Sequence, residues 1–386
     1  MPVLARKSQC TGCTACASIC PMQCIQMKEN EDGFLYPKVN TTSCSSCGAC
    51  EQVCSVLHDE MRDRVLTKAY AAFSVDDSLR KNSSSGGIFS ELAELVLQVD
   101  GIVYGACYNK DCLVEHIGID KIEFLWKLRG AKYSQSNLHD TFRFIKKQLE
   151  SGKQVLFSGT PCQVAGLKSY LKRDYDNLIC IDFVCHGVPS PMVWKEYVKY
   201  RSKIDNNGSL PKSINLRNKD TGWSKYAYSV EFKYSDNNRY VCKNNDDKYM
   251  YLFVNDYILR ESCSDCHFKG YNRLSDITLG DFWGIWSVDP DMDDNKGTSL
   301  VLTHTMKGER LFGAIKEKIK SKPVSFEAAT KMNPSLLYSS AHKQNREKVL
   351  FEIRNNGFQA VVSSILSGQL KKNSLKSRIW RIFRKL

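Results

Sequence analysis

The chain has 386 residues, 17 of them cysteine, with a formal net charge of +13 and 42% hydrophobic residues. This length predicts two or three domains with proper cores, and no apolar run reaches the roughly 18–20 residues of a membrane-spanning helix. The first residues lack the apolar segment of a signal peptide, so the cysteines predict metal–thiolate chemistry in the reducing cytoplasm rather than disulfides.

Two matching cysteine runs occupy the first 54 residues. The spacing Cys-x2-Cys-x2-Cys-x3-Cys runs from Cys10 to Cys20, followed by Pro21, and again from Cys44 to Cys54, followed by Ser55. Such runs bind two 4Fe-4S clusters in bacterial-type ferredoxins, where the fourth cysteine of each run serves the other cluster. The expected ligand sets are Cys10, Cys13, Cys16 and Cys54 for one cluster, and Cys44, Cys47, Cys50 and Cys20 for the other. A zinc ribbon needs only two separated pairs, so the runs predict a two-cluster ferredoxin-type domain over residues 1–58.

Residues 68–200 are predicted to form an α/β domain with a partly parallel sheet. After a polar linker and a strand over 68–75, a Ser-Ser-Ser-Gly-Gly loop (83–87) leads into an amphipathic helix. The N–H groups and dipole at the start of such a helix can bind a phosphate. An ordinary serine N-cap explains the same pattern equally well.

Two strand–loop–helix units follow between residues 153 and 203. Strands are expected over 155–157 and 178–184, and the loops after them contain Cys162 and Cys185. Parallel βαβ units bring such loops to one edge of the sheet, beside helix N-termini that favour thiolates. We therefore expect Cys162 and Cys185 to lie close together.

The second half of the chain carries one further cysteine pair. Cys263 and Cys266 lie on a polar loop before a strand expected over 276–279, and with Cys162 and Cys185 they would complete the ligands of a third cluster. A zinc site or unrelated thiols explain the spacing equally well. The remaining cysteines are expected to be packing residues: Cys24, Cys107, Cys112, Cys180 and Cys242.

Residues 201–345 are predicted to form a further domain, and 346–386 a helical tail. β-like segments alternate with turns over 212–260, and residues 309–319 are the clearest helix. The last sixteen residues, 371–386, hold seven Lys or Arg and no acid. They predict a basic amphipathic helix that either contacts a membrane surface, at the inner face, or folds onto its own domain. Because more than half of the net charge lies there, no nucleic-acid partner is expected.

In combination, the motifs resemble those of one family. After the two cysteine runs come SSSGG, GAKYSQS, GTPCQVAGL, CHGVPSP, RNKDTGW, CSDC and DITLGDFWG, in an order similar to that of the beta subunits of coenzyme F-420-reducing hydrogenases and dehydrogenases. The resemblance runs from Cys10 to about Trp286. It implies an iron–sulfur flavoprotein that binds FAD and exchanges electrons with a two-electron partner. Similar proteins also occur in bacterial polysaccharide gene clusters.

The resemblance also implies roles for individual residues. It places a third 4Fe-4S cluster on Cys162, Cys185, Cys263 and Cys266, next to the flavin. The residues that it places around FAD are Ser83, Ser84, Ser85, Gly86, Gly87, Lys132, Tyr133, Gly159, Thr160 and Pro161.

Two functions fit these observations. In the first, the chain is an oxidoreductase in which electrons pass through three clusters to a flavin, which reacts with a redox partner protein or a small two-electron acceptor or donor. In the second, it is an electron-transfer subunit that serves a separate enzyme and has no substrate site. No catalytic residue is identified: His186 is expected to fix its loop, and Asp281 to be a buried turn residue. No G-x-G-x-x-G follows a strand, so a nicotinamide-binding unit is not expected.

Overall fold

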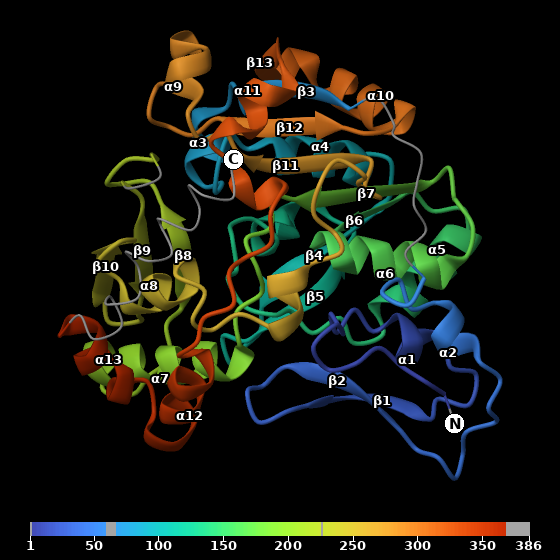
Figure 1. Ribbon diagram of the computed structural model, residues 1–386. Helices are drawn as coiled ribbons and strands as arrows, with labels where there is room; N and C mark the ends of the chain where they lie inside the picture. Colours follow the sequence, from blue (N-terminus) through green and yellow to red (C-terminus); the bar gives the residue numbers. More distant parts are fainter. Residues whose placement is uncertain (1, 59–66, 225–226, 368–386) are drawn as a thin grey trace, which may run out of the picture.

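Three sheets organise the computed structural model, which describes residues 2–58, 67–224 and 227–367 (Figure 1). A two-stranded sheet lies near the N-terminus, an eight-stranded sheet has the order β13-β3-β12-β11-β7-β6-β4-β5, and a three-stranded sheet has the order β10-β9-β8. The predicted α+β / α/β class with a partly parallel sheet and C-terminal helices is confirmed. The basic segment 371–386 lies outside the described residues, and within them no helix is long and apolar enough to span a membrane.

The N-terminal residues form a small module beside the large sheet (Figure 1). Helices α1 (Ala15–Ile19) and α2 (Ala49–Gln52) accompany an antiparallel hairpin of β1 (Ile25–Glu29) and β2 (Leu35–Val39). Gly33, in the hairpin turn, has a φ of +78°, which glycine adopts without strain. The hairpin predicted between the two cysteine runs is therefore confirmed.

The centre of the eight-stranded sheet is parallel. Its four parallel strands are β4 (Ile102–Tyr108), β6 (Val155–Ser158), β7 (Leu178–Phe183) and β11 (Ile277–Asp281). Helix α6 (Pro161–Leu171) follows β6, and α7 (Pro191–Asn206) follows β7, each with proline in its first turn. The proline N–H would be unpaired there in any case, so proline marks a helix start at little cost. The predicted βαβ units are confirmed.

Antiparallel strands complete this sheet on both sides. They are β3 (Lys68–Ser74), β12 (Ser299–Thr303) and β13 (Ile319–Val324) beyond β11, and β5 (Val114–Ile119) beyond β4. The sheet thus contains strands from both sides of the proposed boundary between residues 200 and 201. The division into 68–200, 201–345 and 346–386 stays a prediction.

Side chains of the parallel strands alternate between two buried faces. Leu156, Ile179 and Ile181 pack with α4 (Ile88–Leu97), and on the same face Phe312 of α10 (Met306–Ala314) is buried. Val155 and Phe157 face the opposite side, where α5 (Thr141–Glu150) and α6 cover them. Because both faces are covered, β6 and β7 are apolar along most of their length.

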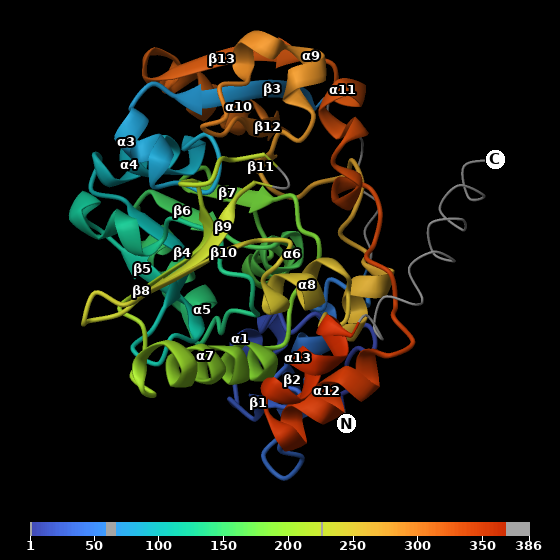
Figure 2. The same cartoon turned by 90° about the vertical axis from the view of Figure 1, so that its left-hand side faces the viewer.

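A second core lies beside the large sheet (Figure 2). Trp194 and Tyr197 of α7 are buried in it, against the small antiparallel sheet and the C-terminal helices. Its other elements are β8 (Ser213–Asn218), β9 (Ser229–Lys233), β10 (Arg239–Lys243), α8 (Lys248–Val254), α12 (Arg346–Asn356) and α13 (Gln359–Leu366). The other α-helices of the described residues are α3 (Asp77–Lys81), α9 (Ile285–Val288) and α11 (Phe326–Lys331).

The helix predicted over residues 309–319 is wrong at its end. Helix α10 ends at Ala314, and Ile319 already begins β13, which pairs with β3 at the edge of the sheet. The strand IKSKPV has an exposed lysine and Pro323, which cannot donate to a ladder and is tolerated at an edge. Ile315 and Ile319 continue the helical spacing, but pairing with β3 decides the local structure.

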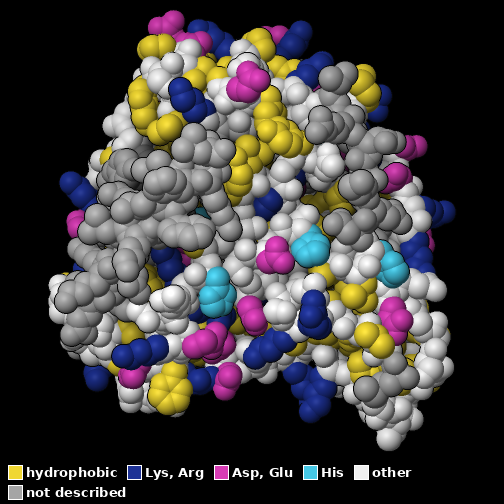
Figure 3. All heavy atoms as spheres, viewed as in Figure 1, with side chains coloured by type: hydrophobic (Ala, Val, Ile, Leu, Met, Phe, Trp, Pro, Cys, Tyr) yellow, Lys and Arg dark blue, Asp and Glu magenta, His cyan; other side chains and the backbone are white. Residues whose placement is uncertain are grey.

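On the face shown in Figure 3, Lys and Arg side chains are interspersed with Asp and Glu. Hydrophobic side chains gather mainly in the upper half of this view, and histidines lie near its middle.

Two buried histidines predict sensitivity to acid. Burial lowers the pKa of His116 to about 4 and that of His304 to about 3, below the value of about 6.5 in an unfolded chain. Between these values the unfolded state binds more protons, so the free energy of unfolding falls as pH drops from about 6.5 to about 4. We expect His116→Gln to reduce this slope, measured by urea unfolding at several pH values. His342→Gln, at an exposed position, is the control, and an unchanged slope in His116→Gln would contradict the prediction.

Candidate metal centres and cofactor site

Four N-terminal cysteines lie together around the start of α1: Cys10, Cys13, Cys16 and Cys54. We call them the inner cysteine group. Burial, together with the nearby thiols of Cys10 and Cys54, raises the pKa of Cys13 to about 11. Gly12, with a φ of +71°, and Thr14, with a φ of +65°, turn the loop that carries these side chains. Cys54 of the second run thus lies with three cysteines of the first run, and the assignment of these four as ligands of one cluster stays a prediction.

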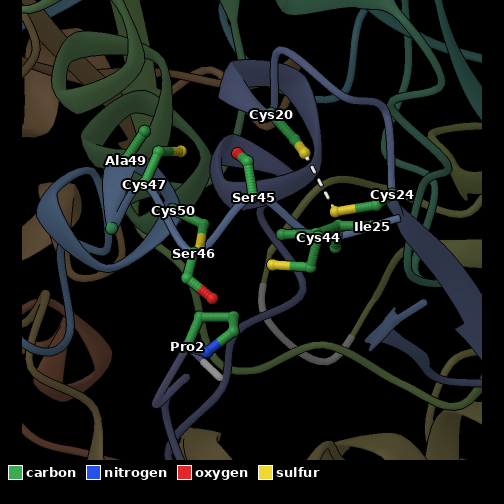
Figure 4. A pocket seen from close by; sticks show the side chains of 11 residues that line it. Pro2, Cys20, Cys24, Ile25, Cys44, Ser45, Ser46, Cys47, Ala49 and Cys50 are labelled. Atoms are coloured by element: carbon green, nitrogen blue, oxygen red, sulfur yellow. Dashed lines mark hydrogen bonds between the residues drawn. The ribbon is translucent and has the colours of Figure 1, made fainter. Parts of the chain in front are cut away.

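The second set of cysteines, called the outer cysteine group, lines a small cavity (Figure 4): Cys20, Cys44, Cys47 and Cys50. Cys47 is exposed, whereas Cys20 and Cys50 are buried. Cys24 lines the same cavity, and its Sγ lies 3.4 Å from Cys20 Sγ. Cys24 was expected to be only a packing residue. It is buried, but it also faces the predicted ligands.

The third cysteine group lines a separate cavity: Cys162, Cys185, Cys263 and Cys266. Cys162 lies in the first turn of α6, Cys185 follows β7, and the other two belong to a short 3-10 turn, η2 (Glu261–Asp265), and its end. This convergence follows from the sheet, because the loops after adjacent parallel strands emerge at one edge. Thr160 caps α6 together with Gln163, and its Oγ1 lies 3.1 Å from Cys162 Sγ.

The chemistry of the third group fits an iron–sulfur cluster. Burial raises the pKa of Cys162 well above 9, and the neighbouring thiols of Cys266 and Cys185 raise it further. Four thiolates in such a cavity repel one another unless positive charge relieves the repulsion, and the irons of a cluster would supply that charge. Three cationic side chains also line the cavity: Arg260, Lys269 and Arg273.

Among the described residues, no three His, Cys, Asp or Glu side chains converge closely enough to hold a single metal ion. A 4Fe-4S cluster does not require such convergence, because each cysteine binds a different iron and the sulfurs surround the whole cluster.

Helix α6 joins the inner group to the third group. Gly166 lies one turn after Cys162, and a Cβ atom at Gly166 would stand 2.8 Å from Cys13 Sγ. Arg260, which lines the third cavity, donates from Nε to the carbonyl of Cys10 at 2.7 Å and from Nη2 to that of Leu35 at 3.0 Å. Sequence reasoning did not select either residue. The glycine inside a helix was a signal of close packing that could have identified Gly166.

Gly166→Val should therefore weaken docking of the N-terminal module. The added side chain would overlap Cys13 and α6 is buried, so a loss of about 1–3 kcal/mol in the free energy of unfolding is expected. The measurement is urea unfolding, with the iron content of the folded protein as a second readout. Gly313→Ala, in α10 with no atom within 4 Å of the new Cβ, is the matched control and should be neutral or stabilising. Equal behaviour of the two variants would contradict the prediction.

The loop 83–87 is held by segments distant in sequence. The hydroxyl of Ser84 accepts from the N–H of Ala131 at 2.7 Å, its carbonyl accepts from Trp223 Nε1 at 3.2 Å, and the carbonyl of Ser85 accepts from Lys219 Nζ at 2.6 Å. A Cβ on Gly86 would lie 2.5 Å from the carbonyl oxygen of Ala72, so the close approach of loop and strand requires glycine. The SSSGG, GAKYSQS and RNKDTGW motifs thus meet at one place.

An ion pair between Arg217 and Asp281 lies beside the 83–87 loop. We call the loop, its contacts and this ion pair the candidate flavin site. Arg217 Nη2 lies 2.8 Å from Asp281 Oδ2, and the guanidinium covers the Tyr228 ring at 3.8 Å. Trp223 and Trp283 stack nearby, with ring centroids 5.0 Å apart. Burial raises the pKa of Asp281, and Arg217 counteracts this rise. Sequence reasoning missed Arg217 and assigned Asp281 only to a turn.

Two features of the candidate flavin site fit an anionic group. Arg217 Nε is buried and has no acceptor within the part of the chain that the structure describes. Helix α4 begins at Ile88, directly after the loop, and its N-cap, Gly87 with a φ of +89°, provides no side-chain cap. A buried donor and a helix N-terminus together suit a phosphate.

The other residues expected around a flavin divide into two sets. Lys132 Nζ donates to the carbonyls of Lys127 and Arg129, at 3.1 and 2.6 Å, so it holds its own loop, and burial lowers its pKa to about 7. Tyr133 packs between Phe253 and Arg217. The second set, Gly159, Thr160 and Pro161, lies at the start of α6 beside the third cysteine group. Pro161 lines the cavity of that group.

Aromatic contacts connect the third cysteine group with the candidate flavin site. His186, next to Cys185, meets Phe253 edge-on with ring centroids 5.3 Å apart, and Phe253 lies 4.7 Å from Tyr133. Arg217 in turn approaches the Tyr133 hydroxyl and opposes the rise in its pKa that burial causes. His186 Nε2 also lies 2.7 Å from Asp256 Oδ1. This partner supports the structural role expected for the histidine.

The ferredoxin-like module and its paired cysteine groups define an iron–sulfur protein, and residues 9–57 match the family described as "4Fe-4S dicluster domain". Residues 152–327 match the family of the C-terminal part of the coenzyme F420 hydrogenase/dehydrogenase beta subunits. A chain from the F420-reducing [NiFe] hydrogenase complex of Methanosarcina barkeri, determined in a xenon-derivatization study, has 19% sequence identity and a TM-score of 0.48, over 76% of this chain and 95% of that one. No curated protein matches the chain.

Proposed function

We propose that this protein is an iron–sulfur flavoprotein oxidoreductase in which three 4Fe-4S clusters exchange electrons with FAD. The clusters are assigned to the inner, outer and third cysteine groups, and FAD to the candidate flavin site. The observation that carries this proposal is the chain of ring contacts from His186 through Phe253 to Tyr133. Phe253 and Tyr133 lie between His186, next to Cys185, and Arg217, and this supports electron exchange between the third group and the candidate flavin site.

The order of the groups supports a path for electrons. The outer group includes the exposed Cys47, the inner group touches α6 at Gly166, and α6 carries Cys162 of the third group. Electrons entering at the outer group would pass to the inner group and then to the third.

At the candidate flavin site, the chain's own residues would bind and orient the cofactor. Arg217 and the start of α4 offer donors to a phosphate, while Lys219 holds the serine–glycine loop through the Ser85 carbonyl. A bound flavin supplies exchange between one-electron and two-electron chemistry. The two-electron partner is a small molecule or a second redox protein, and the polysaccharide context of similar proteins adds glycan intermediates to the candidates.

The second candidate function is an electron-transfer subunit without its own substrate site. The description of the matched family as a beta subunit favours it. Turnover of a small two-electron acceptor by the purified chain would support the first function, whereas electron transfer only to an added enzyme would support the second.

Anaerobic purification with iron, sulfide and flavin quantified per chain tests the proposal. We expect about 12 iron atoms, from three clusters of four, and about one flavin. Iron and sulfide without flavin would remove the flavoprotein assignment. About eight iron atoms would remove the third cluster and leave the dicluster domain.

A further inference from the structure

Five cysteines line the cavity of the outer group, one more than a 4Fe-4S cluster requires. The fifth is Cys24, and Figure 4 shows its side chain and that of Cys20 pointing towards each other, beside Cys44. The two Sγ atoms are 3.4 Å apart. Cys20 is 8% exposed and Cys24 5%, so both sulfurs are shielded from solvent. The cavity of the third group, by contrast, is lined by four cysteines.

The backbone after α1 creates this arrangement. The N–H of Gln23 donates to the carbonyl of Cys20 at 3.1 Å, and Gln23 has a φ of +48°, so the chain reverses direction within four residues. The N–H of Asn40 donates to the carbonyl of Cys24 at 2.7 Å and fixes that residue immediately before β1. Both sulfurs therefore face the same side of the cavity from well-anchored backbone.

We propose that Cys24 is a reserve ligand of the outer cluster that can replace Cys20 as the fourth thiolate, an inference that rests on the proposed iron–sulfur function. In the exchange, the iron–Sγ bond to Cys20 breaks and an iron–Sγ bond to Cys24 forms. The proton of the Cys24 thiol passes to the Cys20 sulfur, so neither the charge nor the number of electrons changes. The close contact of the two sulfurs makes this transfer direct.

Four variants of the full chain test the proposal: Cys20→Ala, Cys24→Ala, the double variant, and Cys47→Ala as a ligand without a neighbouring substitute. Iron and sulfide per chain are measured after anaerobic purification, with electron paramagnetic resonance spectra of the reduced protein. We expect each single variant at Cys20 or Cys24 to keep the wild-type iron content. The double variant and Cys47→Ala should lose up to about four iron atoms. Cys20→Ala should also alter the spectrum of one cluster, because its fourth ligand has moved.

Loss of as much iron in Cys20→Ala as in the double variant would overturn the proposal. Wild-type protein without iron in its N-terminal module would overturn the proposed function instead. Circular dichroism of each variant checks that the chain folds. If Cys20→Ala does not fold, Cys24→Ala still tests the proposal. Because it lacks the reserve ligand, a chelator should remove its iron several-fold faster than that of the wild type. An unchanged rate of iron loss would contradict the proposal.

Discussion

Replacement of Cys162 with alanine should remove about four of about 12 iron atoms and abolish reduction of the bound flavin by the N-terminal clusters. Cys162 lies in the first turn of α6, the helix that touches the inner group at Gly166, and it lines the cavity shared with Cys185, Cys263 and Cys266. Without Cys162, the proposed third cluster would lose the ligand carried by the helix that packs against the inner group. The measurements are iron per chain and the flavin absorbance after reduction of the N-terminal clusters.

The matched control for this variant is Cys107→Ala. Cys107 is a buried cysteine of β4 that packs in the main core, outside the three cysteine groups. It should keep full iron and normal flavin reduction, with only the small loss of stability of a core substitution. Full iron together with unchanged flavin reduction in Cys162→Ala would show that the third group binds no cluster.

Arg217→Met should cost about 3–5 kcal/mol in the free energy of unfolding and release the flavin. The Arg217 side chain is 2% exposed and that of Asp281 19%, so removing the cation leaves a largely buried carboxylate without its partner. The variant also loses the unpaired Nε donor proposed for the cofactor. Urea unfolding and flavin content per chain measure the two effects.

A double variant separates stability from binding. Arg217→Met with Asp281→Leu removes both charges, so it should recover much of the lost stability while remaining without flavin. Recovery of flavin together with stability would mean that Arg217 supports the fold and does not contact the cofactor. Arg217→Lys tests the geometry, because an ammonium keeps the charge but not the planar set of donors.

Local patterns predicted much of this fold correctly. Strand β7 and helix α7 lie where an apolar run and a Ser-Pro start placed them, because burial on both faces and proline at a first turn are local properties. The pattern failed at Ile319, where the apolar spacing suits a helix but pairing with β3 produces an edge strand. Such pairing depends on residues more than 200 positions away, which no local window contains.

The same division applies to the sites. By itself, the sequence determined the two cysteine runs and the loops that carry Cys162 and Cys185, because ligand spacing and the order of strands and helices are written along the chain. Only the tertiary structure decided that Cys24 faces Cys20, that Gly166 touches Cys13, and that Arg217 pairs with Asp281. Gly166 and Cys13, like Arg217 and Asp281, lie on separate elements that pack together, so no sequence spacing predicts their contacts. Cys20 and Cys24 are close in the sequence, but the turn at Gln23 that brings their sulfurs together is not evident from the cysteine spacing.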